Sequence, residues 1–216
     1  RLREIQHYQT NFNILLNLLD ALNGLNARII YTGTVAQYKQ NCKINESTSS
    51  EPPNNYGASK QITSLLGHHL CKTYGLEFVD LRLFSPYGMN EKSSRLIPSV
   101  IKSLLQDKRV EINNGQEKRD YTYIDDVVDA MTECIANNRV VGKTINICSG
   151  KSIEIIKIVE SLQKILGVNK KIVDKKKSSI INYTTDNKLA LKLLNWKPKV
   201  NINEGLQKTV DVILNR

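Results

Sequence analysis

The chain has 216 residues, of which 40% are hydrophobic, and this content supports one domain with its own core plus a small second lobe. The composition has none of the biases of disordered or fibrous proteins. No run of about 18 apolar residues occurs, and the first ten residues lack the apolar stretch of a signal peptide. The sequence therefore favours a soluble, cytoplasmic protein over a membrane or secreted one.

The formal net charge of +10 raises the question of nucleic-acid binding. Much of the excess lies in one segment, at Lys170, Lys171, Lys175, Lys176 and Lys177. Aromatic residues do not alternate with these lysines as they do on a base-stacking surface, so we expect a solvated surface and no nucleic-acid partner. The four cysteines are scattered without a C-x-x-C pair, so we expect neither a disulfide framework nor a metal site.

Helical and strand patterns alternate along the first part of the chain. Apolar residues recur at three and four positions from Ile5 to Leu22, which predicts an amphipathic helix. A buried strand is predicted from Ala27 to Tyr31, leading into the polar turn Thr32–Thr34. A second helix from Tyr56 to Tyr74 and a second strand from Glu77 to Phe84 follow. This alternation predicts a parallel sheet with helical crossovers.

The pattern changes after Gly88, where the elements become shorter. Strands are predicted at Val110–Ile112 and Thr144–Cys148. Helices are predicted at Ile97–Gln106, from Asp125 to about Ala136, and at Ile153–Leu166, Asp186–Leu194 and Asn203–Leu214. Asp125 and Asp126 are interpreted as helix-capping residues.

Tyr56 and Lys60 are four residues apart, so a helix places both side chains on one face. An ammonium near a phenol favours the phenolate, and we expect Lys60 to lower the Tyr56 pKa by roughly two or three pH units. The spacing alone has little specificity because it suits any solvated helix face. Thr34 adds a hydroxyl at the end of the preceding strand. The three residues together form a proton relay for oxidising an alcohol or reducing a ketone beside a nicotinamide ring.

With this triad in place, the chain resembles the extended short-chain dehydrogenase/reductase family of nucleotide-sugar epimerases, dehydratases and reductases. Residues 32–38 are similar to the family's Ser-Ser-Ser-x-x-Val-Tyr-Gly stretch, with Lys39 in place of the glycine. The resemblance implies that Thr34 is the catalytic hydroxyl and Tyr56 the acid and base. It also implies that Lys60 binds the cofactor ribose and tunes the tyrosine.

Two later segments extend the resemblance. Residues 81–88 are similar to the family's Leu-Arg-x-Phe-Asn-Val-Tyr-Gly turn, with Ser85 in place of asparagine, and residues 115–121 resemble its G-x-Q-x-R-D-[FY] segment. The implied cofactor contacts are Tyr56, Lys60, Phe84 and Ser85. The implied substrate contacts are Thr34, Ser85, Tyr87, Arg95, Leu96, Arg119 and Tyr121. Arg119 suits the substrate diphosphate because its planar fork grips phosphate through two hydrogen bonds.

The glycine-rich fingerprint of dinucleotide-binding turns does not occur among the 11 glycines, so we expect an N-terminally truncated member of this family. The expected fold is α/β: a partial Rossmann-like, doubly wound parallel sheet without its first strands, and a small C-terminal α+β substrate lobe. Residues 1–88 are assigned to the Rossmann-type domain. Residues 89–216 are assigned mainly to a nucleotide-sugar-binding lobe, with 119–148 returning to the sheet.

The resemblance implies NAD or NADP as cofactor, with NAD favoured, and a nucleotide-diphosphate sugar as substrate. Val35 and Ala36 stand where dehydratases carry an Asp-Glu pair, which disfavours dehydration. A 4-epimerase is favoured, and a 4-keto-sugar reductase is the alternative. A non-catalytic remnant or nucleotide-sugar-binding module is the alternative from another class. A homodimer through helices 5–22 and 56–74 is also implied. The three histidines, His7, His68 and His69, are interpreted as surface or packing residues.

Overall fold

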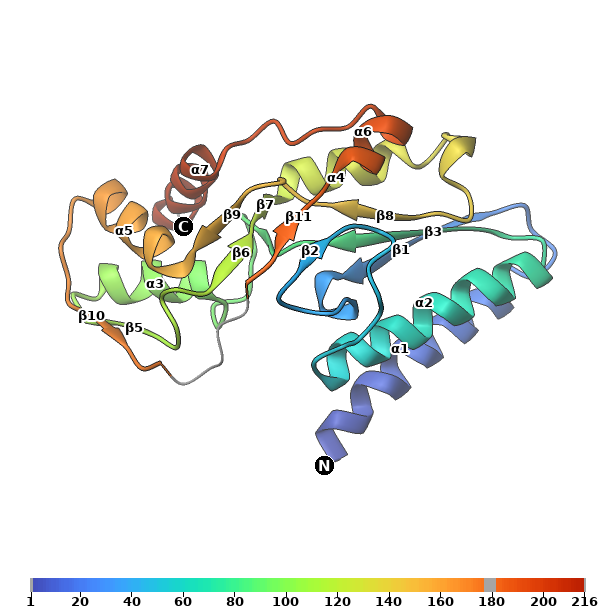
Figure 1. Ribbon diagram of the computed structural model, residues 1–216, viewed down its shortest axis with the longest axis horizontal. Coiled ribbons are helices and arrows are strands. Elements are labelled where there is room, and N and C mark those ends of the chain that lie inside the picture. The colour runs from blue at the N-terminus through green and yellow to red at the C-terminus, as the bar shows by residue number, and fades with distance from the viewer. Residues whose placement is uncertain (1, 177–181, 216) are drawn as a thin grey trace.

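Three parallel strands form the central sheet of the computed structural model, which describes residues 2–176 and 182–215. Their order is β1 (Arg28–Thr34), β3 (Glu77–Leu83) and β8 (Thr144–Ile147) (Figure 1). The pairing of β1 with β3 continues to Thr34 opposite Leu83, so β1 runs through the predicted turn Thr32–Thr34. Both strands therefore end at one edge of the sheet, where parallel α/β folds bind ligands.

Helices cover both faces of this sheet (Figure 1). On one face lie α1 (Leu2–Ala21) and α2 (Asn55–Thr73), and on the other lie α4 (Ile124–Glu133) and α6 (Lys188–Leu194). Side chains of β3 point alternately to the two faces of the sheet. Phe78 packs with α1 and α2, whereas the buried Val79 and Leu81 pack with α4 and α6. The predicted α/β fold with a parallel sheet is confirmed.

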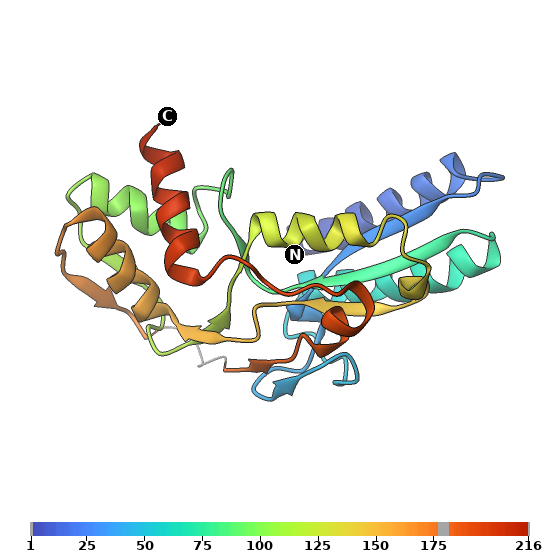
Figure 2. The same ribbon diagram turned by 90° about the horizontal axis from the view of Figure 1, so that it is seen from above.

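A second lobe lies at one end of the elongated molecule (Figure 2). It contains α3 (Leu96–Leu105), α5 (Ile155–Leu166) and α7 (Ile202–Leu214) around one apolar cluster. The parallel pair β5 (Val110–Ile112) and β10 (Ile172–Asp174) closes its outer side.

Several very short elements tie distant parts of the chain together. They are η1 (Val35–Gln37), β2 (Lys43–Ile44), β4 (Pro86–Tyr87), β6 (Lys118–Asp120), β7 (Thr122–Tyr123), η2 (Asn138–Val140), β9 (Ser152–Glu154) and β11 (Thr184–Thr185). Strand β4 pairs with β7, β6 with β9, and β2 with β11. The sequence patterns missed these strands because two or three residues show no periodicity.

Asp126 does not have the capping role expected for it. Helix α4 begins without a side-chain cap. The Asp126 carboxylate is buried and accepts the backbone N–H groups of Lys199 at 2.9 Å and Val200 at 3.1 Å. It therefore holds the segment that leads into α7, and the capping prediction was wrong because this later segment reaches the carboxylate.

No helix in the part of the chain that the structure describes is both long enough and apolar enough to cross a membrane. Of the lysine-rich segment, Lys177 lies outside the described residues.

Candidate active site

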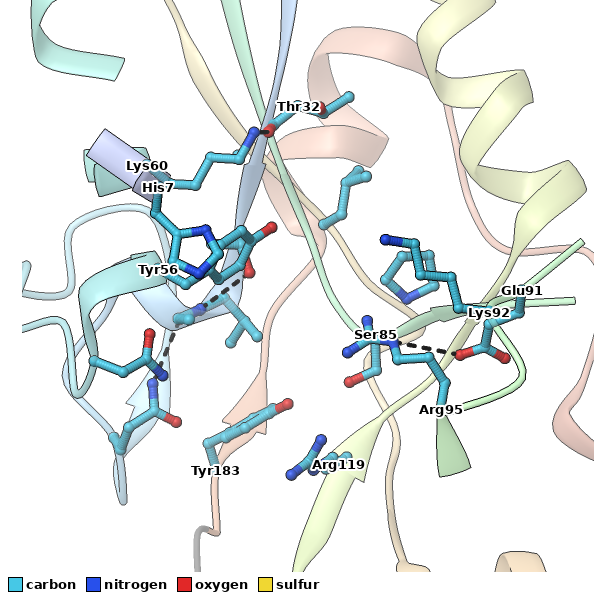
Figure 3. Close-up of a pocket in the computed structure, with 18 of the residues that line it drawn as sticks. His7, Thr32, Tyr56, Lys60, Ser85, Glu91, Lys92, Arg95, Arg119 and Tyr183 are labelled. Atoms are coloured by element: carbon cyan, nitrogen blue, oxygen red, sulfur yellow. Dashed lines mark hydrogen bonds and ion pairs between the residues drawn. The ribbon is translucent and has the colours of Figure 1, made fainter. Parts of the chain in front are cut away.

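A cleft of about 780 Å³ lies where β1 and β3 end, between the sheet and the second lobe (Figure 3). This volume is typical of small-molecule sites. One side, here called the sheet wall, consists of Thr32, Gly33, Thr34, Val35, Ala36, Tyr56 and Lys60. The opposite side, here called the lobe wall, consists of Ser85, Pro86, Glu91, Lys92, Arg95, Glu117 and Arg119, and Tyr183 beside β11 also lines the cleft.

Gly57 brings Tyr56 close to Thr34. A Cβ atom at Gly57 would lie 2.0 Å from the Ala36 carbonyl oxygen, so only glycine lets the first turn of α2 pack directly on η1. Asn54 caps the helix, since its Oδ1 accepts the Gly57 N–H at 2.9 Å. This packing keeps the Tyr56 hydroxyl near enough to Thr34 for hydrogen bonding from Thr34 to lower the pKa of Tyr56.

Thr34 is held at both its backbone and its side chain. Its backbone N–H donates to Gln37 Oε1 at 2.7 Å, and its Oγ1 accepts the Ala36 N–H at 3.3 Å. A hydroxyl has one donor and two acceptor positions, so these contacts leave the O–H of Thr34 free to donate the hydrogen bond that lowers the pKa of Tyr56.

The expected electrostatic effect of Lys60 on Tyr56 was wrong. Lys60 Nζ donates to the Thr32 carbonyl oxygen at 3.0 Å (Figure 3). It also lies 4.8 Å from the centre of the Tyr31 ring. Burial raises the pKa of Tyr56, whereas the positive charge of Arg95 and the hydrogen bond with Thr34 lower it. The cation that acts on Tyr56 therefore comes from the lobe wall. Burial lowers the pKa of Lys60 itself, against the opposing charge of Asp80.

Charged pairs dominate the lobe wall. Glu117 is buried and pairs with Arg119 at 2.5 Å, whereas Arg95 lies 3.7 Å from Glu91. Burial raises the pKa of Glu91 to about 7, although Arg95 opposes this effect. Glu91 Oε2 is buried with no hydrogen-bond partner among the described residues. With Lys92, this wall presents three cations and two carboxyl groups to the cleft.

The structure brings six of the predicted site residues together and separates four from them. Those that line the cleft are Thr34, Tyr56, Lys60, Ser85, Arg95 and Arg119. The other four are Phe84, Tyr87, Leu96 and Tyr121. Phe84 and Tyr87 are fully buried, and Leu96 and Tyr121 pack against the core of the second lobe. Their predicted ligand contacts stay predictions, and the Tyr121 hydroxyl lies within electrostatic reach of Arg119 and Glu117 of the cleft.

Ser85 has a backbone φ of +31°, a region that few residues other than glycine and asparagine occupy readily. This strain explains why the resembled turn carries asparagine here.

Sequence reasoning missed several residues of the cleft. The His7 ring meets the Tyr56 ring edge to face, with 5.9 Å between centres, and no periodicity pointed to that contact. Glu91 and Lys92 lie in the loop before α3, and Tyr183 directly precedes the two-residue strand β11, so none of them gave a signal. Glu117 could have been found, because it occupies the glutamine position of the G-x-Q-x-R-D segment. Among residues 2–176 and 182–215, no three His, Cys, Asp or Glu side chains gather as metal ligands would.

Comparisons with known proteins agree with this geometry. The model of the NAD dependent epimerase/dehydratase family matches residues 3–148. A UDP-glucuronate 4-epimerase of Thermodesulfobacterium geofontis is 29% identical over 95% of this chain and 65% of its own length. A dTDP-4-dehydro-6-deoxyglucose reductase of Escherichia coli is 28% identical over 84% of this chain and 59% of its own length. The chain thus spans less than two thirds of either relative.

A solved structure gives the same result in three dimensions. The UDP-glucuronic acid 4-epimerase of Bacillus cereus, in complex with UDP-glucuronic acid and NAD, superposes with a TM-score of 0.85 and 27% identity. The superposition covers 95% of this chain and 67% of the epimerase. Since the family model covers more than half of the sequence, the chain belongs to the NAD dependent epimerase/dehydratase family.

Proposed function

We propose that this chain carries the reacting site of an NAD(P)-dependent enzyme that modifies a nucleotide-linked sugar through a 4-keto intermediate, with 4-epimerisation as the reaction. One observation supports this above all: Thr34, Tyr56 and Lys60 converge on one wall of a cleft whose other wall carries Arg95 and Arg119. Acid and base groups thus face cations suited to a diphosphate.

In this proposal, Tyr56 removes the proton from the sugar hydroxyl and later returns it. When substrate is bound, Thr34 turns its O–H, which the capping contacts do not use, from Tyr56 to the same sugar oxygen. Arg95 stabilises the phenolate form of Tyr56, in line with its lowering of the pKa of that residue. Arg119 grips the diphosphate after exchanging part of its contact with Glu117.

The residues present fit the nicotinamide half of the cofactor. An ammonium has three N–H donors and Thr32 accepts one of those of Lys60, which leaves two for ribose hydroxyls. Ser85 lines the same part of the cleft opposite Tyr56. NAD or NADP, when bound, supplies the hydride acceptor and donor of the reaction. We favour NAD because both the family and the B. cereus complex carry that name.

A 4-keto-sugar reductase is the second candidate, supported by the E. coli relative. Both reactions use the same three residues and differ in whether the hydride returns to the same sugar. Dehydration is disfavoured because Val35 and Ala36, which line the sheet wall, carry no acid or base.

Calorimetry with UDP-, dTDP-, GDP- and CDP-sugars, neutral and carboxylated, tests the substrate class. We expect one nucleotide to bind, and binding by none would contradict the proposal. Turnover is then assayed with NAD for C4 epimers, and with NADPH and a 4-keto sugar for reduction. Binding without either turnover would support a nucleotide-sugar-binding module.

A homodimer through α1 and α2 is the proposed assembly. The two helices pack on each other and still expose apolar side chains, among them Ile14, Ile62 and Leu65. We expect light scattering to give the mass of a dimer, and Leu65→Glu to give a monomer because a charge would be buried in the interface. Leu191→Glu, at an exposed position of α6, is the control. Cytoplasmic location stays a prediction.

A further inference from the structure

A chain of buried polar side chains runs behind the sheet wall. Gln37 is completely buried, and its side-chain amide makes two hydrogen bonds. Its Oε1 accepts the Thr34 N–H at 2.7 Å, and its Nε2 donates to Gln61 Oε1 at 3.0 Å. Gln61 directly follows Lys60 on α2. One amide thus connects the strand end that carries Thr34 to the helix that carries Tyr56 and Lys60.

Gln61 is in turn fixed to the sheet. Arg82 of β3 donates from Nη2 to the same Gln61 Oε1 at 3.0 Å, and its Nε lies 3.3 Å from Asp80 Oδ2. Arg82 and Asp80 are both buried. A buried ion pair is costly unless its groups are well bonded. The hydrogen bond that Gln61 Oε1 accepts from Arg82 therefore helps to offset the cost of burying this pair.

The backbone of the sheet wall presses directly on these side chains. A Cβ atom at Gly33 would lie 2.4 Å from Asp80 Oδ1 and 2.6 Å from Gln37 Oε1. Thr34 therefore follows a backbone position that has no room to move toward the network. Because Gln37 Oε1 accepts the Thr34 N–H, a displacement of the Gln37 side chain displaces Thr34 or breaks this hydrogen bond.

Helix capping explains only part of the Gln37 contacts. With Thr34, Gln37 forms the capping box of η1, which accounts for the bond to the Thr34 N–H. Capping requires neither complete burial nor the second bond, to Gln61 on another helix. In the stretch that residues 32–38 resemble, valine stands at the position of Gln37, and valine would fill the space without either bond.

We propose that Gln37 and Gln61 are positioning residues that set the distance between the hydroxyls of Thr34 and Tyr56. The inference rests on the proposed function, because both hydroxyls act there on one sugar oxygen. Neither amide touches the substrate. Their effect is on the geometry of proton transfer and not on binding.

Three variants distinguish an effect on the position of the Thr34 and Tyr56 hydroxyls from an effect on the stability of the fold. Gln37→Val and Gln61→Leu remove the bridge, whereas Gln61→Glu keeps an acceptor for both Gln37 and Arg82. We expect kcat to fall about 10- to 100-fold in the first two variants, because misplaced reacting groups cost that much. KM is expected to stay within about twofold, and Gln61→Glu to restore kcat to within about threefold. A rise in KM with unchanged kcat would overturn the inference.

A double-mutant cycle tests whether Gln37 acts through Thr34. In a Thr34→Val background, where the hydroxyl to be positioned is gone, Gln37→Val is expected to lower kcat by no more than about twofold further. An undiminished loss in that background would show that Gln37 supports the fold and not Thr34.

Hydrogen exchange gives a reading independent of turnover. Gln61 does not touch Thr34, yet we expect Gln61→Leu to speed exchange of the Thr34 amide about tenfold, with no change at Ile145 in β8 and with recovery in Gln61→Glu. If the unmodified protein shows no turnover, the proposed function fails and this exchange result alone decides the inference. Unchanged Thr34 exchange in Gln61→Leu would overturn it.

Discussion

The two walls of the cleft are stabilised in opposite ways. The sheet wall depends on close backbone approaches at Gly33 and Gly57 and on buried, mostly uncharged hydrogen bonds. The lobe wall depends on ion pairs whose cations remain accessible, with Arg95 and Arg119 side chains 60% and 41% exposed. The comparison indicates that one wall fixes geometry for proton transfer, whereas the other supplies adjustable charge for binding.

The largest expected effect is on the sheet wall. Tyr56→Phe removes the proposed acid and base, and we expect turnover to fall about 10²- to 10⁴-fold, the usual contribution of such a group. Nucleotide-sugar affinity by calorimetry should not change, because anion binding belongs to the lobe wall. Tyr74→Phe, at an exposed position, is the control. If Tyr56→Phe lost as much affinity as turnover, the proposed division of roles between the two walls would be wrong.

The close approach at Gly57 can be broken by one methyl group. Gly57→Ala places a Cβ against the Ala36 carbonyl, and we expect unfolding free energy to drop by about 3 kcal/mol, the upper part of the range for overpacking. Turnover per folded molecule should also fall, because α2 must move Tyr56 away from Thr34.

Gly75→Ala is the matched control for this effect. It is the same change just beyond the other end of α2, with nothing within 4 Å and a φ of +71°. In Gly75→Ala, strain in the left-handed region is expected to lower the free energy of unfolding by about 1 kcal/mol. Chemical denaturation measures both variants, and equal losses would mean that the contact with η1 can relax.

On the lobe wall, Arg119→Met should weaken binding and leave the chemistry of bound substrate unchanged. We expect affinity for the nucleotide-sugar to fall about 10- to 100-fold, as for lost hydrogen bonds to a charged group. The exposed Arg109, paired with Glu111, provides the control Arg109→Met. A fall in kcat without a change in affinity would assign Arg119 to the reaction itself.

Glu91 gives the lobe wall a pH dependence. Because burial raises its pKa from 4.5 to about 7, folding favours the neutral form. This contribution is fully present below about pH 4.5 and is lost as the pH rises to about 7. Glu91→Gln should therefore stabilise the protein by about 3 kcal/mol at pH 8 and hardly at all at pH 4.5.

Thermal unfolding at several pH values checks this prediction. A hydrogen bond from Lys39 lowers the pKa of exposed Glu51, so Glu51→Gln should show the opposite sign. A pH-independent gain in Glu91→Gln would show that Glu91 is charged throughout.

Local patterns were enough to predict the frame of the sheet wall. The i, i+4 spacing of Tyr56 and Lys60 and the hydroxyl at Thr34 are both readable from sequence, and all three line the cleft. The direction of the Lys60 ammonium was not readable, since it depends on the carbonyl oxygen of Thr32 within β1, and no pattern in the sequence marks that oxygen as its acceptor. A spacing fixes which residues share a helix face and not which partner each side chain selects.

The lobe wall was less predictable because it is assembled from loops and the three-residue strand β6. Arg95 and Arg119 were found through a resemblance to whole segments, whereas Glu91 has no neighbours in a repeating pattern. Its raised pKa comes from burial by parts of the chain far from it in sequence. The same limit applies to Asp126, whose partners, the backbone N–H groups of Lys199 and Val200, lie more than seventy positions later.

The pairing of β2 with β11 has a consequence for how the molecule reaches its final form. Asn182 donates to Asn41 across 141 positions of sequence, and Tyr183, which lines the cleft, lies beside this contact. The next helix, α6, covers one face of the central sheet, so residues 182–194 complete both the cleft and this layer of the fold. Contacts between such distant segments are slow to form. A nascent chain therefore completes its central sheet and its site together, late in synthesis.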